Sequence, residues 1–265
     1  MRRILLTLIV ALTTTISYSQ TDLRLFNHLS VGLNVGTTGI GADIAMPVTR
    51  FFDVEAGVHI MPKIKYNTNL HLNLPTSAIN TNTYLPQPIN IDNVPIQGKI
   101  KMLNGSVLIN FYPIPISSFH VTVGAFFGGE DVAEVYNTID GQLIPVTQAN
   151  EFIKANNFPD DYLIGLKLGD YLLTPDAQGN VRATLKTKNF KPYVGIGIGR
   201  AVPKRRVNFK FDLGAMFWGS PEVVDHNGVS LTKQDWDGKD GGAFKVISKI
   251  KVYPVLKFRV SGRIF

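Results

Sequence analysis

The sequence contains no cysteine at all. It therefore has no disulfide framework, and it is not a lipoprotein anchored through an N-terminal cysteine. Charged residues make up only 18% of the 265 positions while apolar residues make up 45%, which excludes a typical disordered chain. Beyond the N-terminus, no stretch approaches the roughly 18–20 apolar residues that a membrane helix needs.

The N-terminus has the composition of a secretory signal peptide. Arg2 and Arg3 supply its positive charge, and residues 4–12 form an apolar segment too short to span a bilayer. Residues 17–19, Ser-Tyr-Ser, match a small-x-small cleavage site. We predict that residues 1–19 are removed and that the mature chain, residues 20–265, forms a single barrel domain.

The mature sequence is dominated by an alternation of apolar with polar or small residues. This period of two is typical of strands whose two faces meet different environments. It predicts strands at 30–35, 40–46, 53–60, 103–111, 121–127, 194–199, 207–218 and 256–264. The first two would merge into one if Gly36 to Gly39 were a bulge, giving seven strands. Bacterial single-chain barrels have even strand numbers, which favours eight.

The connections between these strands alternate between short and long. Three short ones begin at Pro47, Pro113 and Pro203, where proline ends a ladder and starts a turn. The long polar ones cover about 67–98, 137–187 and 222–242. Within them, 147–156 has the composition of a short helix, and 70–96 that of an irregular loop. This pattern predicts an outer-membrane barrel with short periplasmic turns, long extracellular loops and both termini in the periplasm.

The faces of the strands distinguish a membrane barrel from a soluble one. A membrane-spanning sheet must close on itself, with apolar residues towards lipid and polar residues inside. A soluble, lipocalin-like barrel has the reverse arrangement and remains an alternative here. Aromatic residues at the proline-turn ends predict an interfacial girdle: Phe51, Phe52, Phe111, Tyr112, Tyr253 and Phe265.

The predicted inward face carries the ionisable residues. In VNFKFDLGAMFW, which begins at Val207, Lys210 and Asp212 alternate with apolar and aromatic residues. An eight-stranded barrel is filled by side chains, and buried charges need partners. We predict a polar network in the interior from Asp43, Asp53, Glu55, His59, Lys210, Asp212, Lys257, Arg259 and Arg263. We interpret it as a structural plug; an ion or proton path is the alternative.

Lysines gather at the predicted outer ends of the strands. The net charge is +7, and for an exported chain an anionic membrane surface is a better partner than nucleic acid. Lysine is a good point-charge partner for the phosphates of lipopolysaccharide, although ordinary snorkelling also explains such residues. The predicted contacting rim consists of Lys63, Lys65, Lys99, Lys101, Lys186, Lys188, Lys249 and Lys251.

No pattern of residues predicts catalysis, a cofactor or a metal. His59 alone of the five histidines lies in the middle of a predicted strand, and no serine–histidine pair occurs at strand spacing. Residues 235–240 resemble half of a calcium loop but lack the downstream glutamate, which favours a solvated turn. We therefore expect a non-enzymatic protein, with a lipid A-modifying enzyme as an alternative.

Three segments carry a family resemblance: NFKPYVGIGIGR (189–200), VPKRRVNFKFDLGAMFWGSPEV (202–223) and VYPVLKFRVSG (252–262). The sequence resembles the small outer-membrane β-barrel proteins of Bacteroidota, within the OmpA/OmpX-like and opacity-protein-like superfamily. The resemblance implies no catalytic residues, and it implies insertion by the barrel-assembly machinery. One departure is that alternate positions before Phe265 carry charge, as at Arg263 and Arg259, where the usual terminal pattern is apolar.

Together these observations predict a monomeric, closed antiparallel transmembrane β-barrel in the outer membrane. Its expected role is envelope integrity, or surface interaction through the external loops. A narrow pore and a small-ligand-binding barrel remain alternatives.

Overall fold

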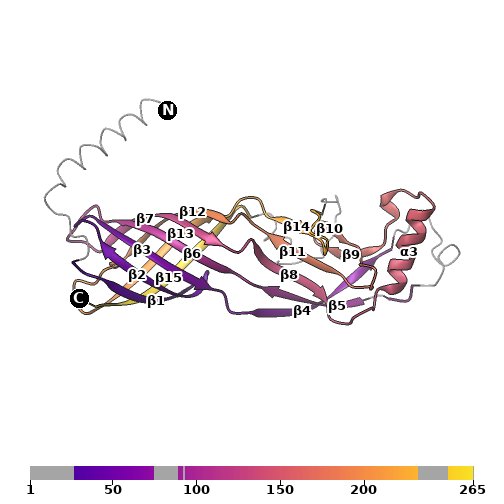
Figure 1. Ribbon diagram of the computed structural model, residues 1–265, viewed down its shortest axis with the longest axis horizontal. Helices are drawn as coiled ribbons and strands as arrows, with labels where there is room; N and C mark the ends of the chain where they lie inside the picture. Colours follow the sequence, from indigo (N-terminus) through magenta and orange to yellow (C-terminus); the bar gives the residue numbers. More distant parts are fainter. Residues whose placement is uncertain (1–26, 75–88, 92, 232–249, 265) are drawn as a thin grey trace, which may run out of the picture.

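A computed structural model describes residues 27–74, 89–91, 93–231 and 250–264. The molecule is elongated, with a barrel at one end and a second sheet, capped by a helix, at the other (Figure 1). The predicted signal peptide lies outside the described residues. Within them, no helix is both long enough and apolar enough to cross a membrane.

Eight antiparallel strands form the closed barrel, as the alternation predicted, in the order β1-β15-β13-β12-β7-β6-β3-β2. Closure occurs where β1 pairs with β15, with Val35 opposite Phe258. The strands are β1 (Ser30–Gly36), β2 (Gly39–Pro47), β3 (Phe52–Ile60), β6 (Leu103–Phe111), β7 (Phe119–Gly128), β12 (Phe190–Ile198), β13 (Val207–Phe217) and β15 (Val252–Arg263).

A tight turn separates β1 from β2, which settles the strand count at eight. Gly36 pairs with Gly39, leaving Thr37 and Thr38 as the turn. Gly39 has a φ of 104°, and a Cβ there would lie 2.2 Å from the carbonyl oxygen of Ile60. Only glycine fits this position without strain. Because Gly36 and Gly39 are paired across Thr37 and Thr38, the chain reverses here and does not continue as one strand with a bulge.

The three short proline-containing connections lie at one end of the barrel. They join β2 to β3, β6 to β7, and β12 to β13. Ser30 and Arg263, which pair at the start of β1 and the end of β15, lie at this same end. We call it the proline-turn end, and the opposite end, where the second sheet begins, the sheet end (Figure 1).

The long connections form a seven-stranded sheet, so the prediction of an irregular loop over 70–96 was wrong where that segment is described. The order is β10-β9-β4-β5-β8-β11-β14. Its strands are β4 (Ile64–Asn73), β5 (Asn93–Ile100), β8 (Asp131–Asn137), β9 (Gly165–Leu168), β10 (Tyr171–Leu173), β11 (Arg182–Lys186) and β14 (Glu222–Val224). The predicted helix is present as α3 (Ile144–Ala155), and a short 3₁₀ turn, η1 (Asp160–Tyr162), follows it.

The two faces of the second sheet have opposite character. One face packs into an apolar core that includes Leu70, Val135 and Leu185 from the sheet and Val146 and Ile153 from α3. These residues come from two connections far apart in sequence, and Val223 adds the third. The other face carries a polar row across four strands, in which neighbouring residues pair in register: Asn67, Gln97, Tyr136 and Arg182.

Candidate functional site: the interior and surface of the barrel

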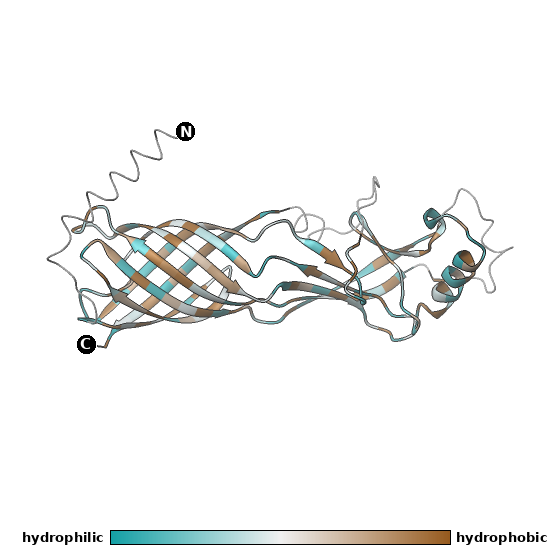
Figure 2. Cartoon of the chain, turned by 45° about the horizontal axis from the view of Figure 1, so that its top comes forward, coloured by the Kyte–Doolittle hydropathy of each residue, from teal (hydrophilic) through white to brown (hydrophobic). Residues whose placement is uncertain are grey.

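The outer surface of the barrel is apolar. Leu33 is 68% exposed, Phe209 61% and Ile60 58%, and similar side chains alternate with inward residues on every strand. Apolar bands therefore wrap the barrel (Figure 2). An apolar belt around a closed antiparallel sheet is the arrangement of an outer-membrane barrel, and it is the reverse of the lipocalin-like alternative.

The interior contains a balanced set of charges. Four carboxylates and four cationic side chains of the barrel strands are buried: Asp43, Asp53, Glu55, Asp212, Lys191, Lys210, Lys257 and Arg259. His59 is buried with them, so the structure places eight of the nine predicted interior residues inside. Arg263 is only half-buried because it belongs to the last pair of β15, at the rim of the barrel.

The central cluster is built around Lys210. Its Nζ lies 3.0 Å from Glu55 Oε2 and 3.0 Å from Asp212 Oδ1. Lys257 Nζ lies 2.5 Å from Glu55 Oε1 and 3.8 Å from Asp212 Oδ2. His120 Nε2 completes the cluster, 2.8 Å from Asp212 Oδ1. Lys210 and Asp212 thus pair with each other and with partners from other strands, which gives each charge of this cluster a counter-charge.

A second cluster lies nearer the proline-turn end. The Arg259 guanidinium donates from Nε to Asp43 Oδ1, over 2.5 Å, and from Nη1 to the Ala201 carbonyl, over 2.6 Å. Asn34 donates to the other oxygen of Asp43 over 2.7 Å. Both charged side chains are therefore hydrogen-bonded as well as paired, which offsets part of the cost of burying them.

The turn between β12 and β13 folds into the proline-turn end and closes it. Ala201 and Val202 of this turn are buried against Ala45. The Ala201 N–H donates to the hydroxyl of Tyr112 over 2.9 Å, and the Ser30 hydroxyl donates to the Ala201 carbonyl over 2.8 Å. Tyr112 is fully buried here, so its predicted place in the outer girdle was wrong.

Apolar side chains close the sheet end of the interior. The cluster consists of Met102, Leu108, Phe126, Val132, Tyr193, Met216, Trp218 and Val255. Trp218 donates from Nε1 to the Ile250 carbonyl over 2.7 Å, and its ring lies 4.7 Å from that of Tyr253. Tyr253 therefore belongs to this closure, at the opposite end from the girdle predicted for it. Leu108 and Phe126 lie in the inward phase of the alternation, which is the signal that could have found them.

A smaller aromatic girdle does lie on the outer surface at the proline-turn end. Phe52 and Phe111 are exposed there and stacked with ring centroids 5.0 Å apart. A second exposed pair, Phe209 and Phe258, has ring centroids 6.0 Å apart and reaches the middle of β15. Phe51, half-exposed, lies under the Arg50 guanidinium at 5.1 Å. Phe265, the remaining member predicted, lies outside the described residues.

A serine, a histidine and an asparagine form a chain inside the barrel that we did not predict. His59 Nε2 lies 2.9 Å from Ser106 Oγ, and Nδ1 lies 3.0 Å from Asn34 Oδ1. In this chain Ser106, His59 and Asn34 take the places that a nucleophile, a base and an orienting group have in a catalytic triad. Ser106 is only 3% exposed, His59 0% and Asn34 4%, so bulk solvent does not reach these side chains. The contact joins adjacent strands, which sequence spacing does not reveal.

The predicted lysine rim maps onto the junction between the two sheets. Lys63 and Lys65 follow β3, Lys99 and Lys101 precede β6, and the others flank β12 and β15. Lys186 and Lys99 are half-buried, while Lys63, Lys65, Lys101, Lys188 and Lys251 are exposed. Lys249 and the calcium-like segment 235–240 lie outside the described residues. Lys191, at the start of β12, points inward and donates to Asn104 Oδ1 over 3.1 Å.

No protein-family model matches the sequence, and no curated protein sequence does. Solved structures with a similar chain path include Acinetobacter baumannii CarO2, at 15% identity and a TM-score of 0.45, over 89% of this chain and 98% of that one. Acinetobacter baumannii CarO has 14% identity and a TM-score of 0.46, over 88% and 96%. A major outer membrane protein from Thermus thermophilus has 14% identity and a TM-score of 0.33, over 89% and 98%.

Proposed function

We propose that the protein is a monomeric, non-enzymatic outer-membrane β-barrel with a closed interior. Its role is to support envelope integrity, or to interact with partners at the cell surface through the second sheet. The observation that carries the proposal is the filling of the barrel at three successive levels. These are the Ala201 and Val202 turn, the ionic clusters, and the apolar closure around Trp218.

This filling opposes the conduction of ions. The largest buried side chains of the barrel include Trp218, Arg259, Tyr112, Phe126 and Lys210, each under 2% exposed. An ion passing through would have to break charge pairs in a low-dielectric interior and displace an apolar layer. The same burial argues against catalysis by Ser106 and His59, because a substrate has no route to them through side chains that fill the barrel.

The orientation follows from the ends of the barrel. We propose that the proline-turn end faces the periplasm, since bacterial barrels have short periplasmic turns and long external segments. The second sheet then lies outside the cell. The signal peptide predicted from the sequence, insertion by the barrel-assembly machinery, and membership of the Bacteroidota OmpA/OmpX-like group belong to the same proposal.

Conductance in planar bilayers tests the closed interior. The purified protein is inserted and first shown to be folded by gel migration that changes on boiling. We expect no steady current, because the interior is filled. A steady, reproducible current from folded protein would overturn the proposal in favour of a narrow pore. Recovery of the protein in the soluble fraction, with migration independent of boiling, would overturn its placement in a membrane.

A further inference from the structure

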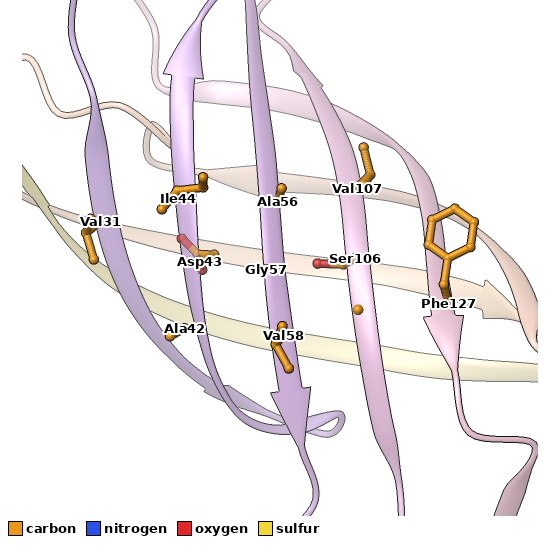
Figure 3. A pocket seen from close by; sticks show the side chains of 11 residues that line it. Val31, Ala42, Asp43, Ile44, Ala56, Gly57, Val58, Ser106, Val107 and Phe127 are labelled. Carbon is orange, nitrogen blue, oxygen red and sulfur yellow. The ribbon is translucent and has the colours of Figure 1, made fainter.

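A shallow groove of about 480 Å³ lies on the membrane-facing surface of the barrel, over β2, β3 and β6. Figure 3 shows the short side chains of Ala42 and Ala56 in the groove, among the larger side chains that border it. The residues that border it are Val31, Ile44, Val58, Val107 and Phe127. Its surface is almost wholly apolar.

The strand register creates the groove. Ala42, Val58 and Gly105 lie side by side on three adjacent strands, and Phe127 follows Gly105 on β7. One step away, Ala56 lies between Ile44 and Val107. Alanine and glycine lower the surface where neighbouring strands carry branched or aromatic side chains. On a lipid-facing surface such a depression is filled by a hydrocarbon chain or by another protein.

Lysines lie on the segments that continue β3 and β6 beyond the sheet end of the groove. Lys63 and Lys65 continue from β3, and Lys99 and Lys101 lead into β6. Lys65 and Lys99 are directly opposite each other in the register of β4 and β5. Like charges at such a position repel each other, and an anion held between them would relieve the repulsion.

The neighbouring carboxylates do not neutralise this pair. Glu134 is opposite Lys99 on the other side, but its Oε1 is paired with Arg182 Nε at 3.2 Å. Around the described part of the barrel rim, no carboxylate forms an ion pair with Lys63, Lys65 or Lys99. By contrast, Lys186 lies 4.0 Å from Asp131, in a cavity that Lys101 also lines. The positive charges of Lys63, Lys65 and Lys99, which no described carboxylate pairs with, therefore lie beyond the sheet end of the groove.

The separation of groove and lysines suits a lipid. At about 3.3 Å per residue, Lys63 lies roughly 17 Å along the chain from Val58 and Lys99 roughly 20 Å from Gly105, while one leaflet of hydrocarbon is about 15 Å thick. Tyr66, 70% exposed, lies on β4 just beyond the barrel. Tyrosine is enriched at the level of lipid headgroups, so the boundary between hydrocarbon and headgroups falls near the lysines.

We propose that the groove and Lys63, Lys65 and Lys99 form one binding site for lipopolysaccharide of the outer leaflet. A fatty acyl chain occupies the groove over Ala42, Ala56 and Gly105, and a phosphate of the headgroup binds the three ammonium groups. This inference rests on the proposed orientation, since it requires the sheet end to face the outer leaflet. Of the lysine rim predicted from the sequence, only the three lysines next to β3 and β6 would then form the binding site.

Native mass spectrometry of protein in detergent, titrated with lipopolysaccharide, tests both halves of the site. We expect the wild type to retain bound lipopolysaccharide. The variant K63Q/K65Q/K99Q should bind lipopolysaccharide at least about tenfold more weakly, because each of the three lysines near an anionic surface contributes about a factor of several. Ala56→Leu, which fills the groove, should weaken retention similarly. Dephosphorylated lipid should bind the wild type and the lysine variant equally.

Matched controls separate the site from general effects. K204Q/R205Q/R206Q removes three charges at the other end, and Ala215→Leu enlarges an outward residue of β13, across the barrel; both should retain lipopolysaccharide as the wild type does. If Ala56→Leu does not fold, Ala42→Val replaces it. Equal retention by all variants overturns the site, and loss in the lysine variant alone overturns the groove. A conductance result that refutes the closed interior leaves this binding assay unaffected.

Discussion

Lys210 and Glu55 meet inside the barrel at 3.0 Å, although 155 positions separate them in the sequence. They belong to β13 and β3, which are not neighbours in the sheet. The contact therefore crosses the interior and ties opposite walls of the barrel together. With Lys257 and Asp212 it forms the centre of the ionic cluster.

Replacing Lys210 by methionine should destabilise the barrel strongly. The change leaves the buried carboxylates one cation short while keeping the side-chain volume similar. Removing one partner of a buried pair typically costs about 3–5 kcal/mol. The free energy of unfolding in denaturant, followed by heat-modifiable gel migration, measures the effect. Lys204→Met, in the exposed proline turn, is the matched control and should change stability by no more than about 0.5 kcal/mol. Equal effects of the two substitutions would show that the cluster is not structural.

Gly32→Ala should disturb the second cluster without changing any charge. A Cβ at Gly32 would lie 2.4 Å from Arg259 Nε, so the guanidinium must move away from Asp43. We expect a loss of about 1–3 kcal/mol, the usual cost of overpacking a filled core. Gly262→Ala is the control on β15, since its Cβ would meet only the Arg206 carbonyl at 3.8 Å. A Gly32→Ala barrel as stable as the control would contradict the assignment of Gly32 as space for Arg259.

The barrel was predictable because lipid imposes a simple rule on every strand. Each strand that crosses the membrane must show an unbroken apolar face, so the period of two is strong even in single strands such as 207–218. The same phase places Lys210, Asp212 and Lys257 inside. His120 lies one step before Thr122 in the inward phase of β7. Extending the alternation by one residue would have found it.

The second sheet and the closures were harder to predict, for different reasons. Beyond the membrane no strand must show a continuous apolar face, so Tyr66 and Asn67 on β4 carry no clear signal. The core of that sheet forms only when distant segments such as those of Leu70, Val135 and Leu185 meet. The Ser106 and His59 contact likewise depends on which strands are neighbours. A single sequence gives the faces of strands but not their partners.

Alkaline pH should weaken the second sheet through Tyr171. Burial raises the pKa of the Tyr171 hydroxyl, and the neighbouring Asp170 carboxylate raises that pKa further. The unfolded chain ionises near the ordinary value of about 10, so folding stability is full below that pH and falls as pH rises towards the higher folded pKa. Tyr171→Phe should reduce the fall. Resistance to protease at pH 9 and pH 11 measures it, and an identical fall in both proteins would contradict the role of Tyr171.

The second sheet should unfold without the barrel when its core is weakened. Leu166 is fully buried at the junction of β9 with β4, where it is opposite Leu72. Leu166→Ala should cost about 2–5 kcal/mol, because the cavity it leaves is only partly filled. That loss falls on the second sheet, whose core shares no residue with the apolar closure around Trp218. We expect faster cleavage of β4 to β11 segments by protease while the barrel keeps its heat-modifiable migration. Ile116→Ala, at a side chain that is 91% exposed, is the control and should leave both unchanged. Simultaneous loss of the barrel in Leu166→Ala would show instead that the two sheets fold as one cooperative unit.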